Sequence, residues 1–188
     1  MAHEIDSEAD RLASLVHGLL DMSRIAGGAL QTSAEVIPVG EIVMPAVQRA
    51  RSGLGHRPLE VAIPDELTSV MVDPVLLNQV IDNLLENVVR HTPADTPVRI
   101  SARPDGDSVV VRVEDAGPGV PPEAMPHVFE KFYRVRPQRG ASRQGTGLGL
   151  AVVEGLVNAM GGSVTASRSG LGGLAIDVRL PRAGEPPE

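Results

Sequence analysis

The first 28 residues carry apolar side chains at the spacing of a helix that packs along a seam. The seam positions are Ile5, Leu12, Leu15, Leu19, Met22 and Ala26. This heptad pattern predicts one long helix with a coiled-coil or bundle seam, and Gly27-Gly28 is expected to end it. The stripe has no partner helix in this chain, and the alternative is a helix that packs on its own domain.

After residue 33 the pattern changes between the two-residue period of strands and the 3.6-residue period of helices. Strands are predicted at 35–39, 59–63, 70–72, 98–102, 108–114, 163–168 and 174–180. Helices are predicted at 41–51, 74–91 and 148–160. Asp73 is expected to cap the middle helix, with Pro74 as its first residue. The turn of the central hairpin is expected at 104–106.

This order of elements predicts a two-layer α/β (α+β) sandwich, with helices on one face of a mixed β-sheet and one long N-terminal helix before it. Residues 120–146 are rich in Pro, Arg and Gly and are expected to form a long, mobile loop. The Pro- and Glu-rich residues 183–188 are expected to be a disordered tail. The folded domain is therefore expected at 33–182, with 1–28 as a separate helical segment.

Composition narrows the class of protein. A length of 188 residues suggests one domain, or one domain with an appendage, and the net charge of -7 argues against a general nucleic-acid surface. The chain has no cysteine, so disulfide and thiolate chemistry are excluded. It contains neither a signal peptide nor an apolar run of the roughly 18 residues that span a bilayer, so we expect a soluble chain, which also suits the soluble part of a membrane protein.

Aromatic residues are few and lie together. The chain has two Phe, one Tyr and no Trp, and these aromatics are Phe129, Phe132 and Tyr133. The core must therefore be built from Leu, Val, Ile and Ala. The aromatic cluster either packs a surface segment down or contacts a ligand.

The helix predicted at 74–91 carries polar side chains among its apolar ones. Asn83 and Asn87 are one turn apart and share a face, and Arg90 and His91 follow them. An amide oxygen is a hard ligand suited to Mg²⁺, and Arg90 supplies positive charge for a phosphate. The alternative is that the two asparagines cap neighbouring loops.

Asp115 follows a Val-rich strand and precedes Gly117 and Gly119. A carboxylate accepts a hydrogen bond from the exocyclic amine of adenine, and glycines let the ring approach the backbone closely. The alternative is an ordinary Asp-Gly turn.

A basic segment and a second glycine-rich motif come later in the chain. The segment 126–146 contains Lys131, Arg134, Arg136, Arg139 and Arg143 against one acid, Glu130. This excess of positive charge suits either an anion or a solvated loop. Residues 145–150 then lead into a helix whose N–H groups point toward phosphate. The motif is not a Walker loop, because no Gly-Lys-Ser/Thr follows.

In this order, the motifs at 83–87, 115–119 and 145–150 resemble those of the ATP-binding catalytic domain of two-component sensor histidine kinases. That family belongs to a wider group with gyrase, MutL-type ATPases and the ninety-kilodalton heat-shock chaperone. The resemblance covers nearly the whole chain, and 19–24 and 84–87 are most similar to the potassium-responsive KdpD-type subgroup. It implies a Bergerat-type ATP-binding fold, preceded at 1–28 by the second helix of an incomplete dimerisation and phosphoacceptor domain.

The resemblance also implies the site. ATP and Mg²⁺ are the expected cofactors, with Asn87 as the metal ligand, Asp115 as the adenine-reading residue and 126–146 as a flexible lid. Asn83, Asn87 and Arg90 are the implied catalytic residues. The implied nucleotide contacts are Asn83, Asn87, Arg90, His91, Asp115, Gly117, Gly119, Val120, Phe132, Tyr133, Arg134, Gln144, Gly145, Thr146, Gly147, Leu148 and Gly149.

The sequence departs from the family pattern at three places. Asn83 stands where ATP-hydrolysing relatives place a glutamate, which favours phosphoryl transfer over hydrolysis. Arg90 stands where Lys is more frequent, which changes the geometry of the phosphate contact. Leu174-Ala175 follow Gly172-Gly173, where a small polar residue often helps hold the adenine through water.

The function implied is transfer of the γ-phosphoryl group of Mg-ATP to a histidine on a separate upstream helix, for relay to a response-regulator aspartate. His3 and His17 lack the phosphoacceptor motif, so neither is expected to be that histidine. The expected partners are the phosphoacceptor helix, the response regulator and a second kinase subunit in a homodimer. The expected location is the cytoplasmic part of a membrane-anchored kinase. The alternatives are a serine kinase of the anti-sigma-factor type and an interaction module without catalysis.

Overall fold

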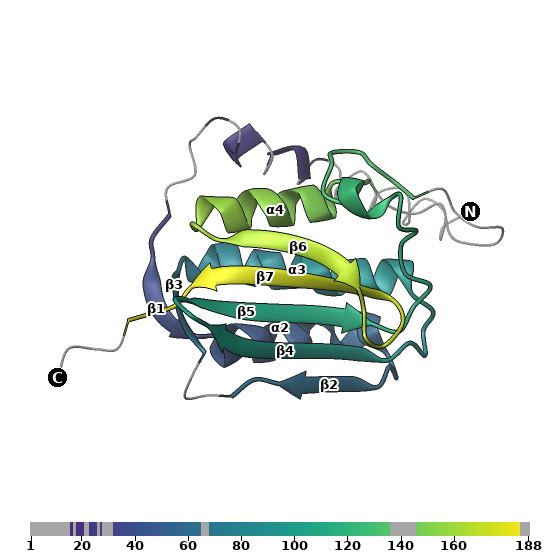
Figure 1. The fold of residues 1–188 in the computed structure, drawn as a ribbon, viewed down its shortest axis with the longest axis horizontal. Coiled ribbons are helices and arrows are strands. Elements are labelled where there is room, and N and C mark those ends of the chain that lie inside the picture. The colour runs from purple at the N-terminus through teal and green to yellow at the C-terminus, as the bar shows by residue number, and fades with distance from the viewer. Residues whose placement is uncertain are drawn as a thin grey trace.

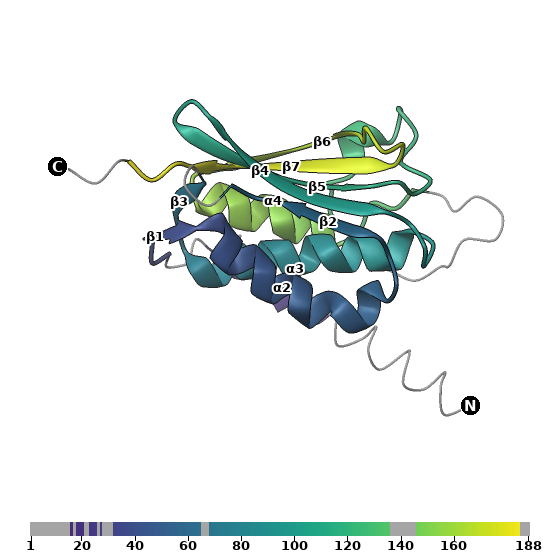
Figure 2. The same ribbon diagram turned by 90° about the horizontal axis from the view of Figure 1, so that it is seen from below.

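A computed structural model describes residues 16, 18–20, 23–25, 27, 32–64, 68–135 and 146–184. The elements follow in the order β1 (Glu35–Pro38), α2 (Val39–Leu54), β2 (Leu59–Ala62), β3 (Ser69–Val72), α3 (Pro74–His91), β4 (Val98–Asp105), β5 (Ser108–Asp115), a 3-10 turn η2 (Met125–His127), α4 (Gly149–Ala159), β6 (Ser163–Arg168) and β7 (Leu174–Pro181). The predicted two-layer α/β sandwich is confirmed, with α2, α3 and α4 on one face of the sheet (Figures 1 and 2).

The main sheet has the strand order β2-β4-β5-β7-β6. β2 pairs with β4 in parallel, and the other pairs are antiparallel, so the sheet is mixed as predicted. β1 and β3 form a separate antiparallel pair in which Glu35 lies opposite Val72. An isolated bridge between Val70 and Arg182 connects this small pair to the chain that follows β7.

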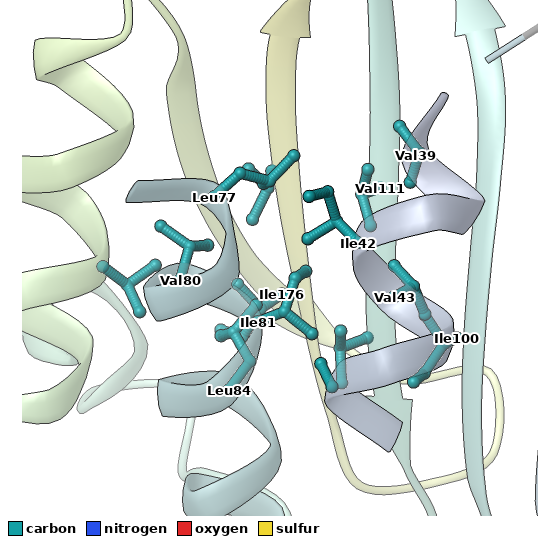
Figure 3. Close-up of a cluster of buried hydrophobic side chains, with 14 of the residues drawn as sticks. Val39, Ile42, Val43, Leu77, Val80, Ile81, Leu84, Ile100, Val111 and Ile176 are labelled. Carbon is teal, nitrogen blue, oxygen red and sulfur yellow. The ribbon is translucent and has the colours of Figure 1, made fainter. Parts of the chain in front are cut away.

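The core lies between the helices and the inner face of the sheet. It is built from Val, Ile and Leu side chains, because strands β4, β5 and β7 turn alternate apolar residues inward. Figure 3 shows this cluster between α2, α3 and the sheet, including Val39, Ile42, Val43, Leu77, Val80, Ile81, Leu84, Ile100, Val111 and Ile176. The buried cluster also contains Ala46, Ala102 and Met160, and Phe129 packs against it while partly exposed, so the predicted core of aliphatic side chains is confirmed.

Helix α3 is specified locally at both ends. The Asp73 carboxylate caps it as predicted, with Oδ1 accepting from the N–H groups of Val75 at 2.9 Å and Leu76 at 3.2 Å. Pro74 occupies the first turn, where its missing N–H costs nothing. Thr92 ends the helix in extended backbone, as expected of a residue before proline. The candidate site residues on α3 therefore lie on a helix whose two ends are fixed.

Two predicted elements were too short, and one turn was misplaced. α2 spans Val39–Leu54 instead of 41–51, and β4 continues to Asp105 instead of ending at residue 102. β4 extends past Pro104 because β2 pairs only as far as Ser101, which leaves the outer edge of β4 free for a residue without an N–H group. Asp105 pairs with Ser108, so the turn lies at Gly106 and Asp107, and Gly106 has the positive φ of 60° that this turn needs.

The structure does not show the predicted long N-terminal helix, because only a part of residues 1–28 is described. Residues 16, 18–20 and 23–25 are helical, while the predicted seam positions Ile5, Leu12, Leu15, Met22 and Ala26 and the tail at 185–188 lie outside the described residues. The described residues lie over α4 (Figure 1). The Ile25 Cδ1 atom is 2.8 Å from the point that a Cβ on Gly155 would occupy, so glycine in α4 permits this close approach.

Candidate functional site

The turn after β5 buries a carboxylate and surrounds it with backbone amides. Asp115 is 5% exposed, and its Oδ1 accepts hydrogen bonds from the N–H groups of Gly117 at 2.8 Å and Leu174 at 3.4 Å. Its backbone carbonyl accepts from the N–H of Gly173 at 3.1 Å. These contacts fasten the predicted Asp-Gly turn to the start of β7 and fix the orientation of the carboxylate.

The surroundings of Asp115 oppose its ionisation overall. Burial raises the pKa of Asp115 above its usual range, and the neighbouring charge of Glu114 acts in the same direction. The N–H groups of Gly117 and Leu174 act against this effect, because they stabilise the charged form. A ligand group that donates a hydrogen bond to this carboxylate would favour its charged form further.

The glycines of this turn are required by close packing. A Cβ on Gly117 would lie 2.7 Å from Cγ2 of Thr92, the residue that ends α3. Gly119 has a φ of 71°, and a Cβ there would lie 3.3 Å from the carbonyl oxygen of Gly173. The turn is therefore pressed between the end of α3 and the β6–β7 loop, with no room for a side chain at Gly117.

The two asparagines of α3 differ in their hydrogen bonding. Asn83 donates from Nδ2 to the Gln79 carbonyl at 2.8 Å, and its Oδ1 lies 3.7 Å from the point that a Cβ on Gly149 would occupy. Asn87 is half-buried and makes no side-chain hydrogen bond to the rest of the described chain. Asn83 thus faces the start of α4, and Asn87 retains a free amide oxygen.

The C-terminal turn of α3 concentrates positive charge. Arg90 is 3.8 Å from the Glu86 carboxylate on the same helix, an exposed pair of little energetic weight. Desolvation of the His91 ring by the surrounding protein is the largest effect that lowers its pKa. The positive charges of Arg90 and Arg134 lower the pKa further. The three side chains therefore share one electrostatic neighbourhood, which an anion would stabilise.

Helix α4 begins without a side-chain cap, and its first turn contains no acidic residue. The turn before it is tight, because Gly147 has a φ of 70° and a Cβ there would lie 2.8 Å from the Tyr133 carbonyl oxygen. The Leu148 N–H is 3.3 Å from Thr146 Oγ1, and the Leu148 side chain is buried, so this residue offers backbone and not side-chain contacts. The N–H groups of the first turn are therefore available to an anion.

The aromatic segment is fastened to this same turn. The Phe132 N–H donates to the Gly147 carbonyl at 2.8 Å, and Phe132 has a φ of 64°, which is unusual for a residue with a bulky side chain. Phe129 packs against the core, as does Val120, whereas the Phe132 side chain is 58% exposed. The Tyr133 ring lies 5.4 Å from the His127 ring, centre to centre. The three aromatic residues therefore differ in role: Phe129 packs against the core, whereas the Phe132 side chain is exposed.

The structure brings the predicted motifs together around the C-terminal half of α3. Gly117 contacts the end of α3, Asn83 faces Gly149, and Gly147 contacts Phe132 and Tyr133. Gln144 and Gly145 lie outside the described residues, as do Arg136, Arg139 and Arg143. The described part of the chain holds no cluster of three His, Cys, Asp or Glu side chains suited to a metal ion.

Sequence reasoning missed several residues that build the site. Arg57 is buried and donates to the carbonyls of Leu54 at 3.0 Å and Thr92 at 3.1 Å, so one guanidinium joins the C-terminal ends of α2 and α3. The amides of Gly173 and Leu174 hold Asp115, and Thr92 covers Gly117. No local pattern marks Arg57 or Thr92, while the Gly172-Gly173 pair gave a weak signal of close approach.

The sequence of the chain is similar to those of known proteins. The profile of the family described as histidine kinase-, DNA gyrase B-, and HSP90-like ATPase matches residues 72–184. Sensor protein KdpD of Escherichia coli K12 is 35% identical over 185 residues, which cover 98% of this chain and 20% of that protein. The signal transduction histidine-protein kinase BaeS of the same organism is 33% identical over 180 residues, covering 94% of this chain and 38% of that protein.

The fold of the chain is also similar to those of solved histidine kinase structures. The mycobacterial sensor histidine kinase MprB superposes with a TM-score of 0.70 at 28% identity, covering 78% of this chain and 97% of that one. Full-length ShkA in complex with AMPPNP superposes with a TM-score of 0.74 at 28% identity, covering 95% of this chain and 38% of that one. This chain spans about a fifth of the length of the KdpD proteins that it matches. Among the described residues, no helix is both long and apolar enough to cross a membrane.

Proposed function

The chain belongs to the family of histidine kinase-, DNA gyrase B- and HSP90-like ATPases, and on that premise we propose that it is the ATP-binding catalytic domain of a sensor histidine kinase. The observation that carries the proposal is the buried Asp115 carboxylate, which two backbone amides hold beside the end of α3. The match to the sensor kinase KdpD extends over 98% of this chain, which favours a histidine kinase over the anti-sigma-factor type of serine kinase.

In the proposed complex Asp115 reads the adenine. Its carboxylate has only acceptor oxygens when it is ionised, so it pairs with the exocyclic amine of adenine and repels the carbonyl of guanine. Gly117 and Gly119 allow the turn to pack closely against Thr92 and Gly173, and this packing fixes the carboxylate beside the proposed base pocket. The half-buried Val120, which packs on the core, offers an apolar contact next to this turn.

The triphosphate would lie between α3 and the start of α4. The uncapped N–H groups of α4, together with Arg90 and Arg134, provide the positive potential that phosphates need, and the neutral His91 ring would donate a hydrogen bond. The lid at 126–146 and the exposed Phe132 would cover the nucleotide. Thr146, Gly147 and Gly149 contribute the backbone turn, and the same role is proposed for Gln144 and Gly145.

Asn87 fits a role in holding Mg²⁺. Its amide oxygen is a hard ligand, and no other described side chain occupies it. A single protein ligand is sufficient for a cation that keeps several waters and binds phosphate oxygens. When bound, the ion would neutralise charge on the phosphates during transfer.

The residues of this chain would position the γ-phosphate for in-line attack by an imidazole nitrogen on a separate helix. The Asn83 side chain already donates to the helix backbone and carries no group that removes a proton from water, which supports transfer to a protein over hydrolysis. We propose 1–28 as the second helix of the dimerisation domain, 33–182 as the catalytic domain and 183–188 as a tail. The proposed partners are the phosphoacceptor helix, a response regulator and a second subunit in the cytoplasmic part of a membrane-anchored kinase.

Two measurements test the proposal. Calorimetric titration of this chain should detect Mg-ATP binding and much weaker Mg-GTP binding. In a chain extended upstream by a helix with a His-Glu-x-Arg-x-Pro motif, γ-labelled ATP should place an acid-labile label on that histidine. Asn87→Ala should abolish labelling, whereas Asn78→Ala, on the opposite face of α3, should retain it. Binding of neither nucleotide, or labelling that survives Asn87→Ala, would contradict the proposal.

A further inference from the structure

A second buried carboxylate lies directly before Asp115 and belongs to a different network. Glu114 is 5% exposed, and its Oε2 accepts the Ser169 hydroxyl at 2.9 Å. Its Oε1 lies 3.5 Å from the Arg99 guanidinium on the neighbouring strand. Because side chains alternate along a strand, Glu114 and Asp115 project to opposite faces of the sheet. Glu114 is therefore outside the set of proposed nucleotide contacts.

Ser169 organises the loop between β6 and β7. It is 5% exposed, and its Oγ also accepts from the Leu171 N–H at 2.9 Å. Its backbone N–H donates to the Gly173 carbonyl at 2.9 Å, and its carbonyl accepts from the Gly172 N–H at 3.0 Å. Ser169 thus connects the start of the loop to Leu171, Gly172 and Gly173 by hydrogen bonds, and its own bond to Glu114 connects the loop to β5.

The closed loop is the wall against which the Asp115 turn rests. Gly173 donates to the Asp115 carbonyl, and its own carbonyl oxygen lies 3.3 Å from the point that a Cβ on Gly119 would occupy. Leu174, the next residue, donates to Asp115 Oδ1. In Figure 1 this loop lies at the end of the sheet where β5 ends. A displacement of Ser169 would therefore move the Gly173 amide, which holds the Asp115 backbone, and the Leu174 amide, which is one of the two donors to its carboxylate beside Gly117.

We propose that Glu114 and Ser169 are positioning residues that set the base selectivity of the site through the Gly173 and Leu174 amides, without touching the nucleotide. This inference rests on the proposed function of Asp115 as the adenine-reading residue. The hydroxyl bond to Glu114 holds the loop in place, and the loop holds the carboxylate in the orientation that accepts from an amine.

A double-mutant cycle tests the inference in the whole chain. Ser169→Ala should weaken Mg-ATP binding by about threefold to thirtyfold, the range of couplings carried through packed contacts, while Mg-GTP binding stays weak and unchanged. The ratio of the two affinities therefore falls. Glu114→Ala should give a similar fall, and the double variant should fall by less than the sum of the two, because both changes remove the hydrogen bond that these side chains share. Ser169→Thr, which keeps the hydroxyl, should restore the ratio.

The matched control is Ser167→Ala, an exposed serine on β6 two residues before Ser169, which should leave the ratio unchanged. A loss of overall stability alone would weaken both nucleotides equally, and that result would overturn the positioning role, as would additive effects in the double variant. In the unmodified protein, ATP should slow amide hydrogen exchange at Gly173 and Leu174, and no slowing would also overturn it. If the unmodified protein binds no ATP, the proposed function itself fails, whereas an unchanged ratio in Ser169→Ala leaves that function standing.

Discussion

At the scale of single residues, Asp115 combines burial with hydrogen bonds that favour its charged form. The effects of burial and of the neighbouring Glu114 charge exceed that of the hydrogen bonds, so the pKa of Asp115 is raised in the folded protein. Between the usual value of about 3.9 and the raised one, the folded state binds more protons than the unfolded chain. The contribution of Asp115 to stability is therefore fully present below the usual pKa and is lost as the pH rises through the raised one.

The first prediction concerns this linkage. Asp115→Asn removes the titrating group, so the free energy of unfolding of the variant relative to the parent should increase as the pH rises from about 4 to 7. Urea unfolding at several pH values measures the difference. Asp95→Asn, at an exposed position, is the control. A difference that stays constant or falls with pH would show that Asp115 does not titrate as described.

A second prediction concerns binding at the same residue. Asp115→Asn keeps the size of the side chain but removes its charge and presents an amide N–H₂ group toward the adenine amine. Loss of a hydrogen bond to a charged group costs about 1.5–3 kcal/mol, so ATP affinity should fall about ten- to a hundredfold. Titration calorimetry with ATP and GTP measures this, and unchanged ATP affinity in a folded variant would refute the base-reading role.

The third prediction uses two glycines of one loop. A Cβ on Gly173 would overlap Asp115 Oδ1 and lie 2.6 Å from the Gly117 nitrogen, whereas a Cβ on Gly170 meets nothing closer than 3.9 Å. Gly173→Ala should therefore lower the free energy of unfolding by about 1–3 kcal/mol, as overpacking does. Gly170→Ala should change it by less than about 0.5 kcal/mol. Equal urea midpoints for the two variants would contradict the close packing.

At the scale of elements, the ends of α3 show what a sequence specifies locally. Asp73-Pro74 at the start and Thr92-Pro93 at the end are local signals, and the helix was predicted over its observed range 74–91. The strands with alternating valines were found for the same reason. The extension of β4 past Pro104 was missed because it depends on how short its partner β2 is. The pairing of β1 with β3 likewise depends on contacts between distant residues.

The candidate site divides in the same way. Asn87, Asp115 and Gly117 belong to short motifs, so the sequence could nominate them as candidate site residues, and their roles stay predictions. Arg57, Thr92 and Ser169 act through partners that are distant in the sequence, with Ser169 bonded to Glu114 across 55 positions. The role of Ser169 appears only when the sheet register brings β5 beside β7 and the β6–β7 loop, and that of Arg57 only when the ends of α2 and α3 meet.

The fourth prediction concerns the cap of α3. Asp73→Ala removes the acceptor for two N–H groups and should lower the free energy of unfolding by about 1–2 kcal/mol. Asp73→Ser keeps a capping oxygen and should recover most of the loss. Urea unfolding followed by circular dichroism measures both variants, and an Ala variant as stable as the Ser variant would show that the cap contributes nothing.

At the scale of the whole molecule, the site lies where three parts of the core converge. α3 packs against both α2 and α4, and the Asp115 turn joins the end of α3 to β7 through backbone contacts. The same side chains of α3 that fill the core in Figure 3 thus fix the face that carries Asn83 and Asn87. We therefore expect a ligand bound there to be coupled to global unfolding and not to the fraying of one loop.

The fifth prediction follows from that coupling. Mg-ATP at about one hundred times its dissociation constant should stabilise the folded chain by about 2.7 kcal/mol. For a protein of this size, that shift corresponds to a rise in Tm of about 5–10 °C. Mg-GTP at the same concentration should give a much smaller rise. Differential scanning calorimetry measures both, and equal shifts for the two nucleotides would argue against a base-specific site.

The Asp73 carboxylate has a second role that becomes clear in mechanical terms. Its Oδ2 accepts the Ser33 N–H at 2.9 Å, so the chain entering the domain is tethered to the start of α3 before β1 begins. With a rise of about 1.5 Å per residue, α3 is a rod roughly 27 Å long, and its far half bears Asn83 and Asn87. We expect tension applied at Thr32 to load this rod at its tip before it reaches the core. Force spectroscopy with a handle at Thr32 should show a lower first rupture force for Asp73→Ser, and an unchanged force would mean that the tether bears no load.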